Sequence, residues 1–115
     1  MYSGLIIKES LSDEKILDYI HIKNVEIWST DHIPKYWTAI TFQSEYEMFP
    51  QKLAQSLKEN KEMPWYVDIS KDGIKYIILK DCVLHYTIGN AKEKEAVISK
   101  CLKLGLDKNQ LDWSE

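Results

Sequence analysis

Residues 65–90 constrain the fold of this chain more than any other segment, because they hold three short apolar stretches separated by only a few turn-forming residues. Short stretches rich in valine, isoleucine and aromatic residues are typical of strands. Connections of two or three residues join antiparallel neighbours. The segment is therefore predicted to form three consecutive antiparallel strands, which fixes its side chains relative to one another.

The two turns set the register of these strands. The Lys-Asp-Gly sequence at 71–73 favours a three-residue hairpin loop, with its glycine in the left-handed conformation. That loop places Asp68 opposite Tyr76. A two-residue turn at 80–81 places Tyr76 opposite His85. The predicted result is a row of a carboxylate, a phenol and an imidazole across three strands.

The same pairing divides the side chains between two faces of the sheet. The predicted core face carries Trp65, Val67, Ile77, Leu79, Cys82 and Leu84. The opposite face carries Tyr66, Asp68, Ile74, Tyr76, Ile78, Val83, His85 and Thr87. This second face is too apolar to be left in water, so we expect it to be covered. A second subunit, forming a homodimer through the sheet, is the leading candidate; the C-terminal tail and a bound ligand are the others.

The row of Asp68, Tyr76 and His85 has two interpretations. It could transfer protons, since histidine titrates near neutral pH. It could equally be a structural strip of hydrogen-bonded polar groups. We favour the structural interpretation because no nucleophile, metal-ligand set or phosphate loop accompanies the row. The row also depends on the turn at 80–81, because a slip of one residue there would move His85 to the other face.

The rest of the chain completes an α+β domain. Strands are predicted at 2–8, 25–30 and 37–43, and helices after Ser12, from near Pro50 and after Asn90. The predicted order is β-α-β-β-α-β-β-β-α, a mainly antiparallel sheet with a ferredoxin-like start, an added hairpin and a C-terminal helix. Residues 1–115 are expected to form a single domain.

Composition argues against several classes of partner. All 15 basic residues are lysines and the net charge is −3. Without the guanidinium fork of arginine, and without a lysine stripe, we expect no nucleic-acid binding. The two cysteines, Cys82 and Cys101, lack metal-ligand spacing, so we expect reduced thiols, no metal and no cofactor. Apolar runs are short and the N-terminus lacks the apolar region of a signal peptide, so we expect a cytoplasmic protein without a membrane span.

Aromatic residues gather around a second candidate site. Trp28, Tyr36 and Trp37 flank one predicted loop. Large aromatic side chains at such a position either anchor a core or line a pocket for a small apolar or aromatic ligand. Core anchoring is the interpretation we favour, and the pocket stays open as the alternative.

The chain also resembles a known group of sequences. The stretches WYVDI at 65–69, KYIILKDCVLHY at 75–86 and QLDW at 110–113 resemble those of small bacterial α+β proteins with no known function. The resemblance implies a two-residue turn at 80–81 and an ordered C-terminal tail. It implies no activity, cofactor or site residue.

These observations favour a non-catalytic binding or protein-interaction domain that uses the second face of its sheet. The candidate binding residues are Tyr66, Asp68, Tyr76, Ile78, His85, Trp28 and Trp37. One alternative is an enzyme that acts on a small molecule in a cleft over Asp68, Tyr76 and His85. Another is an inhibitor or immunity-type partner protein.

Overall fold

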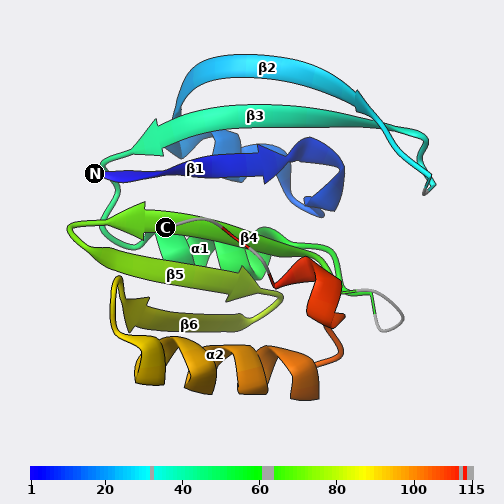
Figure 1. Ribbon diagram of the computed structural model, residues 1–115. Coiled ribbons are helices and arrows are strands. Elements are labelled where there is room, and N and C mark those ends of the chain that lie inside the picture. The colour runs from blue at the N-terminus through cyan, green and yellow to red at the C-terminus, as the bar shows by residue number, and fades with distance from the viewer. Residues whose placement is uncertain (32, 61–63, 112, 114–115) are drawn as a thin grey trace.

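A six-stranded antiparallel sheet forms the centre of the protein (Figure 1). The computed structural model describes residues 1–31, 33–60, 64–111 and 113. In the order β2-β3-β1-β4-β5-β6, the strands are β2 (His21–Ser29), β3 (Tyr36–Ser44), β1 (Tyr2–Ile7), β4 (Tyr66–Lys71), β5 (Ile74–Leu79) and β6 (Cys82–Thr87). The predicted class, α+β with a mainly antiparallel sheet, is confirmed.

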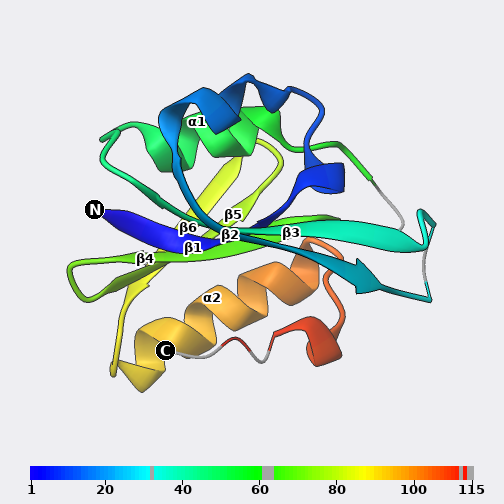
Figure 2. The ribbon, with the colours of Figure 1, turned by 90° about the horizontal axis from the view of Figure 1, so that it is seen from above.

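Helices cover the sheet on both sides (Figure 2). Helix α1 (Phe49–Ser56) has Pro50 in its first turn, as predicted. Helix α2 (Ala91–Lys103) begins at the Asn90 cap, whose Oδ1 accepts the backbone N–H of Glu93 at 3.1 Å. Figure 2 shows α1 on one face of the sheet and α2 on the other. None of the helices in the described ranges is long and apolar enough to cross a membrane.

The first predicted helix is not an α-helix. The segment after β1 forms two short 3₁₀ helices, η1 (Lys8–Ser10) and η2 (Glu14–Tyr19). Between them, Leu11 bridges to Leu57 and the Ser12 N–H donates to the Ser56 carbonyl at 2.7 Å. Because these contacts tie the segment to the end of α1, few residues remain for a regular helix before β2 begins. The predicted element order is therefore wrong at this position.

Two core clusters lie on opposite faces of the sheet. The first core cluster, under α1 and η2, comprises Tyr2, Ile6, Leu11, Ile16, Phe42, Phe49, Leu53, Ala54, Leu57, Val67, Ile69 and Ile78. The second core cluster, under α2 and the C-terminal segment with η3 (Lys108–Gln110), comprises Ile77, Leu79, Tyr86, Val97, Cys101, Leu106, Leu111 and Trp113. The indole N–H of Trp113 donates to the Tyr86 hydroxyl at 2.7 Å, so the tail is anchored as expected.

The register between β4 and β5 differs by one residue from the prediction. Lys71 pairs with Ile74, so the hairpin has a two-residue turn of Asp72 and Gly73, both with positive φ (51° and 80°). An Asp-Gly pair with these angles is typical of a type I′ turn, whose twist matches that of the strands. Asp68 consequently lies opposite Ile77 rather than Tyr76.

The turn at 80–81 is as predicted. Leu79 pairs with Cys82, and Tyr76 pairs with His85. Because side chains alternate along a strand, the one-residue shift in β4 exchanges its two faces and leaves β5 and β6 unchanged. Tyr66 and Asp68 therefore share the α2 face of the sheet with Ile77.

Gly4 allows the two parts of the sheet to join. It lies opposite Ile69 where β1 meets β4. A Cβ atom at this position would stand 2.7 Å from Ile69 Cγ2 and 2.9 Å from the Asp68 carbonyl oxygen. A larger residue would push β4 away from β1, so the glycine sets the position of the strand that carries Tyr66 and Asp68.

Candidate binding cleft

A cavity of about 530 Å³ lies on the α2 side of the sheet. Strands β1 to β4, the segments that flank residues 61–63, and the C-terminal segment all contribute to its wall. The lining residues are Leu5, Ile7, Trp28, Ile33, Trp37, Asn60, Pro64, Trp65, Tyr66, Val67, Asp68 and Gln110. We refer to this cavity as the tryptophan cleft.

Strand register explains why these side chains meet. Trp28 and Trp37 are directly opposite each other on β2 and β3. Ile7 lies opposite Ala39 and therefore shares a face with Trp37, two residues away along β3. Since Gly4 of β1 pairs with Ile69 of β4 in antiparallel fashion, Leu5 lies opposite Asp68. Four adjacent strands thus direct aromatic, aliphatic and acidic side chains to one side.

The aromatic rings of the cleft are held at angles to one another. The Trp37 and Trp65 ring centroids are 5.0 Å apart, with planes inclined at 59°. Tyr66 packs against Trp113, with centroids 6.2 Å apart and planes at 60°. The Tyr66 hydroxyl also donates a hydrogen bond to the Gln110 carbonyl. The C-terminal segment therefore fixes the wall formed by Tyr66.

Asp68 contributes the one carboxylate among the described lining residues. Its Oδ1 lies 3.3 Å from Lys75 Nζ, which reaches it from β5. The Lys75 side chain is only 7% exposed, whereas that of Asp68 is 36% exposed. Asp68 lines the cleft and Lys75 does not, so the carboxylate is the more accessible member of the pair.

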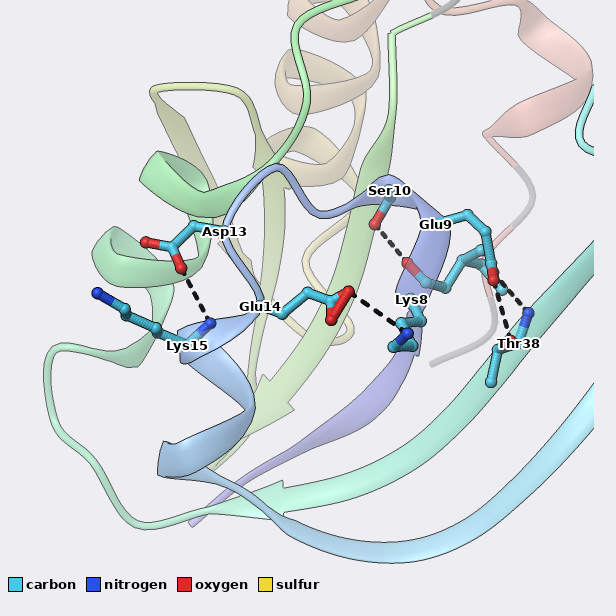
Figure 3. A network of polar contacts seen from close by, with 8 residues as sticks. Lys8, Glu9, Ser10, Asp13, Glu14, Lys15 and Thr38 are labelled. Atoms are coloured by element: carbon cyan, nitrogen blue, oxygen red, sulfur yellow. Dashed lines mark hydrogen bonds and ion pairs between the residues drawn. The ribbon is translucent and has the colours of Figure 1, made fainter.

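Glu9 supports the end of β3 that carries Trp37 (Figure 3). Its Oε1 accepts the Thr38 backbone N–H at 2.6 Å, and its Oε2 accepts the Thr38 hydroxyl at 3.0 Å. Backbone pairing between β1 and β3 ends at Ile7 and Ala39. Beyond this point the Glu9 side chain supplies the hydrogen bonds to β3. Burial opposes ionisation of Glu9, but the hydrogen bonds from Thr38 and from the Glu9 backbone, together with the charge of Lys8, lower the pKa of the carboxyl.

The structure brings four of the seven predicted binding residues together. Trp28, Trp37, Tyr66 and Asp68 all line the tryptophan cleft. Of the two interpretations of the tryptophans, the pocket wall is the one that this arrangement supports.

The other three predicted residues lie on the opposite face. Ile78 is fully buried in the first core cluster, under α1. Tyr76 packs edge-on against Tyr2, with centroids 5.5 Å apart, and its ring lies 6.0 Å from that of His85. Asp68 is therefore separated from Tyr76 and His85 by the sheet itself. The predicted row of acid, phenol and imidazole is wrong because β4 is shifted by one residue.

The apolar face that was expected to need a cover has one within the chain. Ile78 belongs to the same buried cluster as Phe49 and Leu53 of α1, and Tyr76 and Val83 pack against this cluster. The cover is thus a helix of this chain, where a second subunit was the leading candidate.

Sequence reasoning missed Trp65, Gln110 and Glu9. Trp65 was assigned to the core face by strand alternation, but it precedes β4, which begins at Tyr66, so alternation does not fix its direction. No local sequence pattern marks Gln110 or Glu9 as part of the site, because each contributes through a hydrogen bond with a residue that is distant in sequence.

The described part of the chain holds no group of three or more histidine, cysteine, aspartate or glutamate side chains that could bind a metal ion.

The fold and the cleft define an α+β protein with a tryptophan-walled cavity on one face of an antiparallel sheet. Comparison with protein-family models, curated proteins and solved structures gives no match for this chain.

Proposed function

We propose that this protein is a non-catalytic binding domain that takes a small ligand into the tryptophan cleft. The observation that carries the proposal is the cavity of about 530 Å³ walled by three indoles. Ligand sites are typically about 300–1,000 Å³, mostly apolar, with a few polar groups that orient the ligand. Asp68, Asn60 and Gln110 supply such polar groups here.

The enzyme alternative has less support. It required Asp68, Tyr76 and His85 over one cleft, and these residues lie on two faces of the sheet. The described lining of the cleft contains one carboxylate, Asp68, and one phenol, Tyr66, but no histidine, cysteine, serine or lysine. Asp68 is paired with Lys75, and the Tyr66 hydroxyl donates to the Gln110 carbonyl, so both groups already have partners within the chain. A carboxylate held in this way, without a nucleophile in the lining, favours binding over catalysis.

We also infer that β1 to β4 follow a ferredoxin-like arrangement. The strand order β2-β3-β1-β4 supports this, since β3 lies between β2 and β1, and β4 joins the other side of β1. Both connecting segments, η2 and α1, lie on one face of the sheet (Figure 2). Such an arrangement leaves the opposite face of β1 to β3 for the tryptophan cleft.

The test is an NMR titration that follows the indole N–H signals of the four tryptophans. Trp28, Trp37 and Trp65 report on the cleft, and Trp113 reports on its Tyr66 wall. The backbone amide of Leu53 in α1, on the other face of the sheet, is the internal control. The probes are p-cresol, 3,3-dimethylbutan-1-ol, choline and 3,3-dimethylbutanoate, each added to about 10 mM, where Kd values near 1 mM are detected. Saturable shifts of the cleft signals, with the Leu53 amide signal unchanged, support the proposal.

A matched pair of variants controls for effects outside the cleft. Trp28 and Ile27 are neighbours on the exposed edge strand but point to opposite faces. We expect Trp28→Ala to weaken binding of any active probe and Ile27→Ala to leave it unchanged. The proposal is overturned if none of the four probes shifts the cleft signals, or if both variants affect binding equally.

A further inference from the structure

We propose that the tryptophan cleft selects a compact organic cation, namely a methylated ammonium group. This inference rests on the proposed binding function and specifies its ligand. Its basis is the combination of electrostatics and ring geometry within the cleft.

The charges around the cleft favour a cation. Its described lining has one carboxylate, Asp68, and no lysine, and the whole chain has a net charge of −3. The faces of indole and phenol rings carry the negative part of the aromatic quadrupole, and tryptophan attracts cations most strongly. An anion would meet these faces and Asp68 without a positive partner. The same groups stabilise a positive charge.

The angle between the rings favours a rounded group over a flat one. The Trp37 and Trp65 rings are in direct tilted contact, with centroids 5.0 Å apart and planes inclined at 59°, so a flat ligand cannot stack between them. Trp28, opposite Trp37 on the neighbouring strand, adds a third indole to the lining. A rounded trimethylammonium head needs no parallel pair of rings and can contact indoles that lie at different angles. Its methyl groups also lose less on leaving water than the N–H groups of a bare ammonium ion would, because they form no hydrogen bonds there.

Lys75 does not cancel this preference. Its side chain is only 7% exposed and does not line the cleft, whereas Asp68 is 36% exposed and does. The pair therefore presents its negative end to the cleft, and Lys75 holds that end in place. Asp68 then supplies a long-range attraction while the tryptophans supply direct contact.

Three isosteric probes separate charge from shape. Choline, 3,3-dimethylbutan-1-ol and 3,3-dimethylbutanoate share a head of three methyl groups but are cationic, neutral and anionic. We expect choline to bind about tenfold more tightly than the alcohol, in keeping with a partly desolvated cation–π site. The anion should bind more weakly than the alcohol. The Kd values come from the shifts of the cleft indole signals.

Trp28→Leu tests the origin of the preference. Leucine keeps an apolar wall but lacks the aromatic face, so the advantage of choline over the alcohol should fall several-fold while alcohol affinity changes little. Ile27→Leu, on the other face of the same strand, is the matched control. Asp68→Asn should also lower choline affinity, but it leaves Lys75 buried without its partner. If the Asp68 variant does not fold, the Trp28 variant alone tests the cation preference.

The possible outcomes separate this inference from the function on which it rests. Equal affinity for choline and the alcohol, or tighter binding of the anion, overturns the cation preference while the binding function stands. Failure of every probe to bind overturns both. Retention of the full choline preference in Trp28→Leu would also contradict the inference.

Discussion

The two ends of the sheet differ in how they are covered, and this difference explains where the tryptophan cleft lies. In β5, the consecutive residues Ile77 and Ile78 point to opposite faces, and both are 0% exposed. In β2, the consecutive residues Ile27 and Trp28 also point to opposite faces but are 65% and 39% exposed. Helices α1 and α2 enclose the sheet at β5, whereas β2 lies at its edge.

The comparison indicates that β5 is buried on both faces, whereas β1 and β3 contribute to the first core cluster on one face and line the tryptophan cleft on the other. A strand enclosed on both faces has no free surface for a ligand. The tryptophan cleft begins where the cover by α2 ends, at β4, and extends to Trp28 on β2.

The largest expected effect is on the free energy of unfolding, which should respond differently to substitutions at these two ends. Ile78→Ala removes a fully buried side chain between the sheet and α1. It should lower the free energy of unfolding by about 2–5 kcal/mol, through lost burial and the cavity left behind. Ile27→Ala, in an exposed position, should change it by less than about 0.5 kcal/mol. Urea denaturation measures both, and similar losses for the two variants would contradict the comparison.

A smaller effect is expected at Glu9, which holds β3 where its pairing with β1 ends. Glu9→Gln weakens the two hydrogen bonds with Thr38 and should cost about 1 kcal/mol near neutral pH. Because the folded-state pKa of Glu9 is lowered, its contribution is fully present above the ordinary value of 4.5. It is lost as the pH falls through the lower folded-state pKa. Urea denaturation at several pH values gives the profile.

Glu14→Gln is the control within the same polar network (Figure 3). Glu14 forms an exposed ion pair with Lys8 at 3.4 Å. Such a pair contributes little, so we expect a change below that of Glu9→Gln. If the Glu9 variant loses the same stability at acidic and neutral pH, an ionised Glu9 is not what stabilises β3.

The smallest expected effect concerns the two thiols and does not alter stability. Cys101 lies on α2 and is fully buried in the second core cluster, and burial raises the pKa of its thiol to about 11. At pH 8 roughly one thiol in a thousand would be ionised, so iodoacetamide should modify Cys101 very slowly. Cys82 is only partly buried and should react first.

Mass spectrometry of Cys82→Ser isolates Cys101 for this measurement. The single thiol should stay unmodified in the folded protein and react rapidly in urea. Rapid alkylation of Cys101 in native buffer would show that the cover by α2 opens readily.

The sequence predicted secondary structure well where the signals were local. Three antiparallel strands, the pairing of Tyr76 with His85, and the buried tail with Trp113 all follow from apolar patterns and turns. The hairpin at 71–73 was wrong because Lys71 was counted as part of the loop, whereas Asp72 and Gly73 alone form a type I′ turn. One residue was enough to exchange the faces of β4.

The candidate site was predictable only in part, for the same physical reason. Trp28 and Trp37 flank one loop, so their proximity follows from the sequence alone. Trp65 joins them only because β4 lies beside β1, and β1 lies beside β3. That strand order depends on packing between distant segments, which no local pattern of residues encodes.

The irregular pairing of β2 bears on how this protein avoids unwanted assembly. An edge strand has a row of unpaired backbone N–H and C=O groups, with which a strand of another chain could pair. In β2 the register shifts between Ile22 and Asn24, with Lys23 at the shift. This break bends the strand and shortens the longest regular stretch that a second chain could copy. We therefore expect the bulge to limit amyloid-like growth from the strand that also carries Trp28.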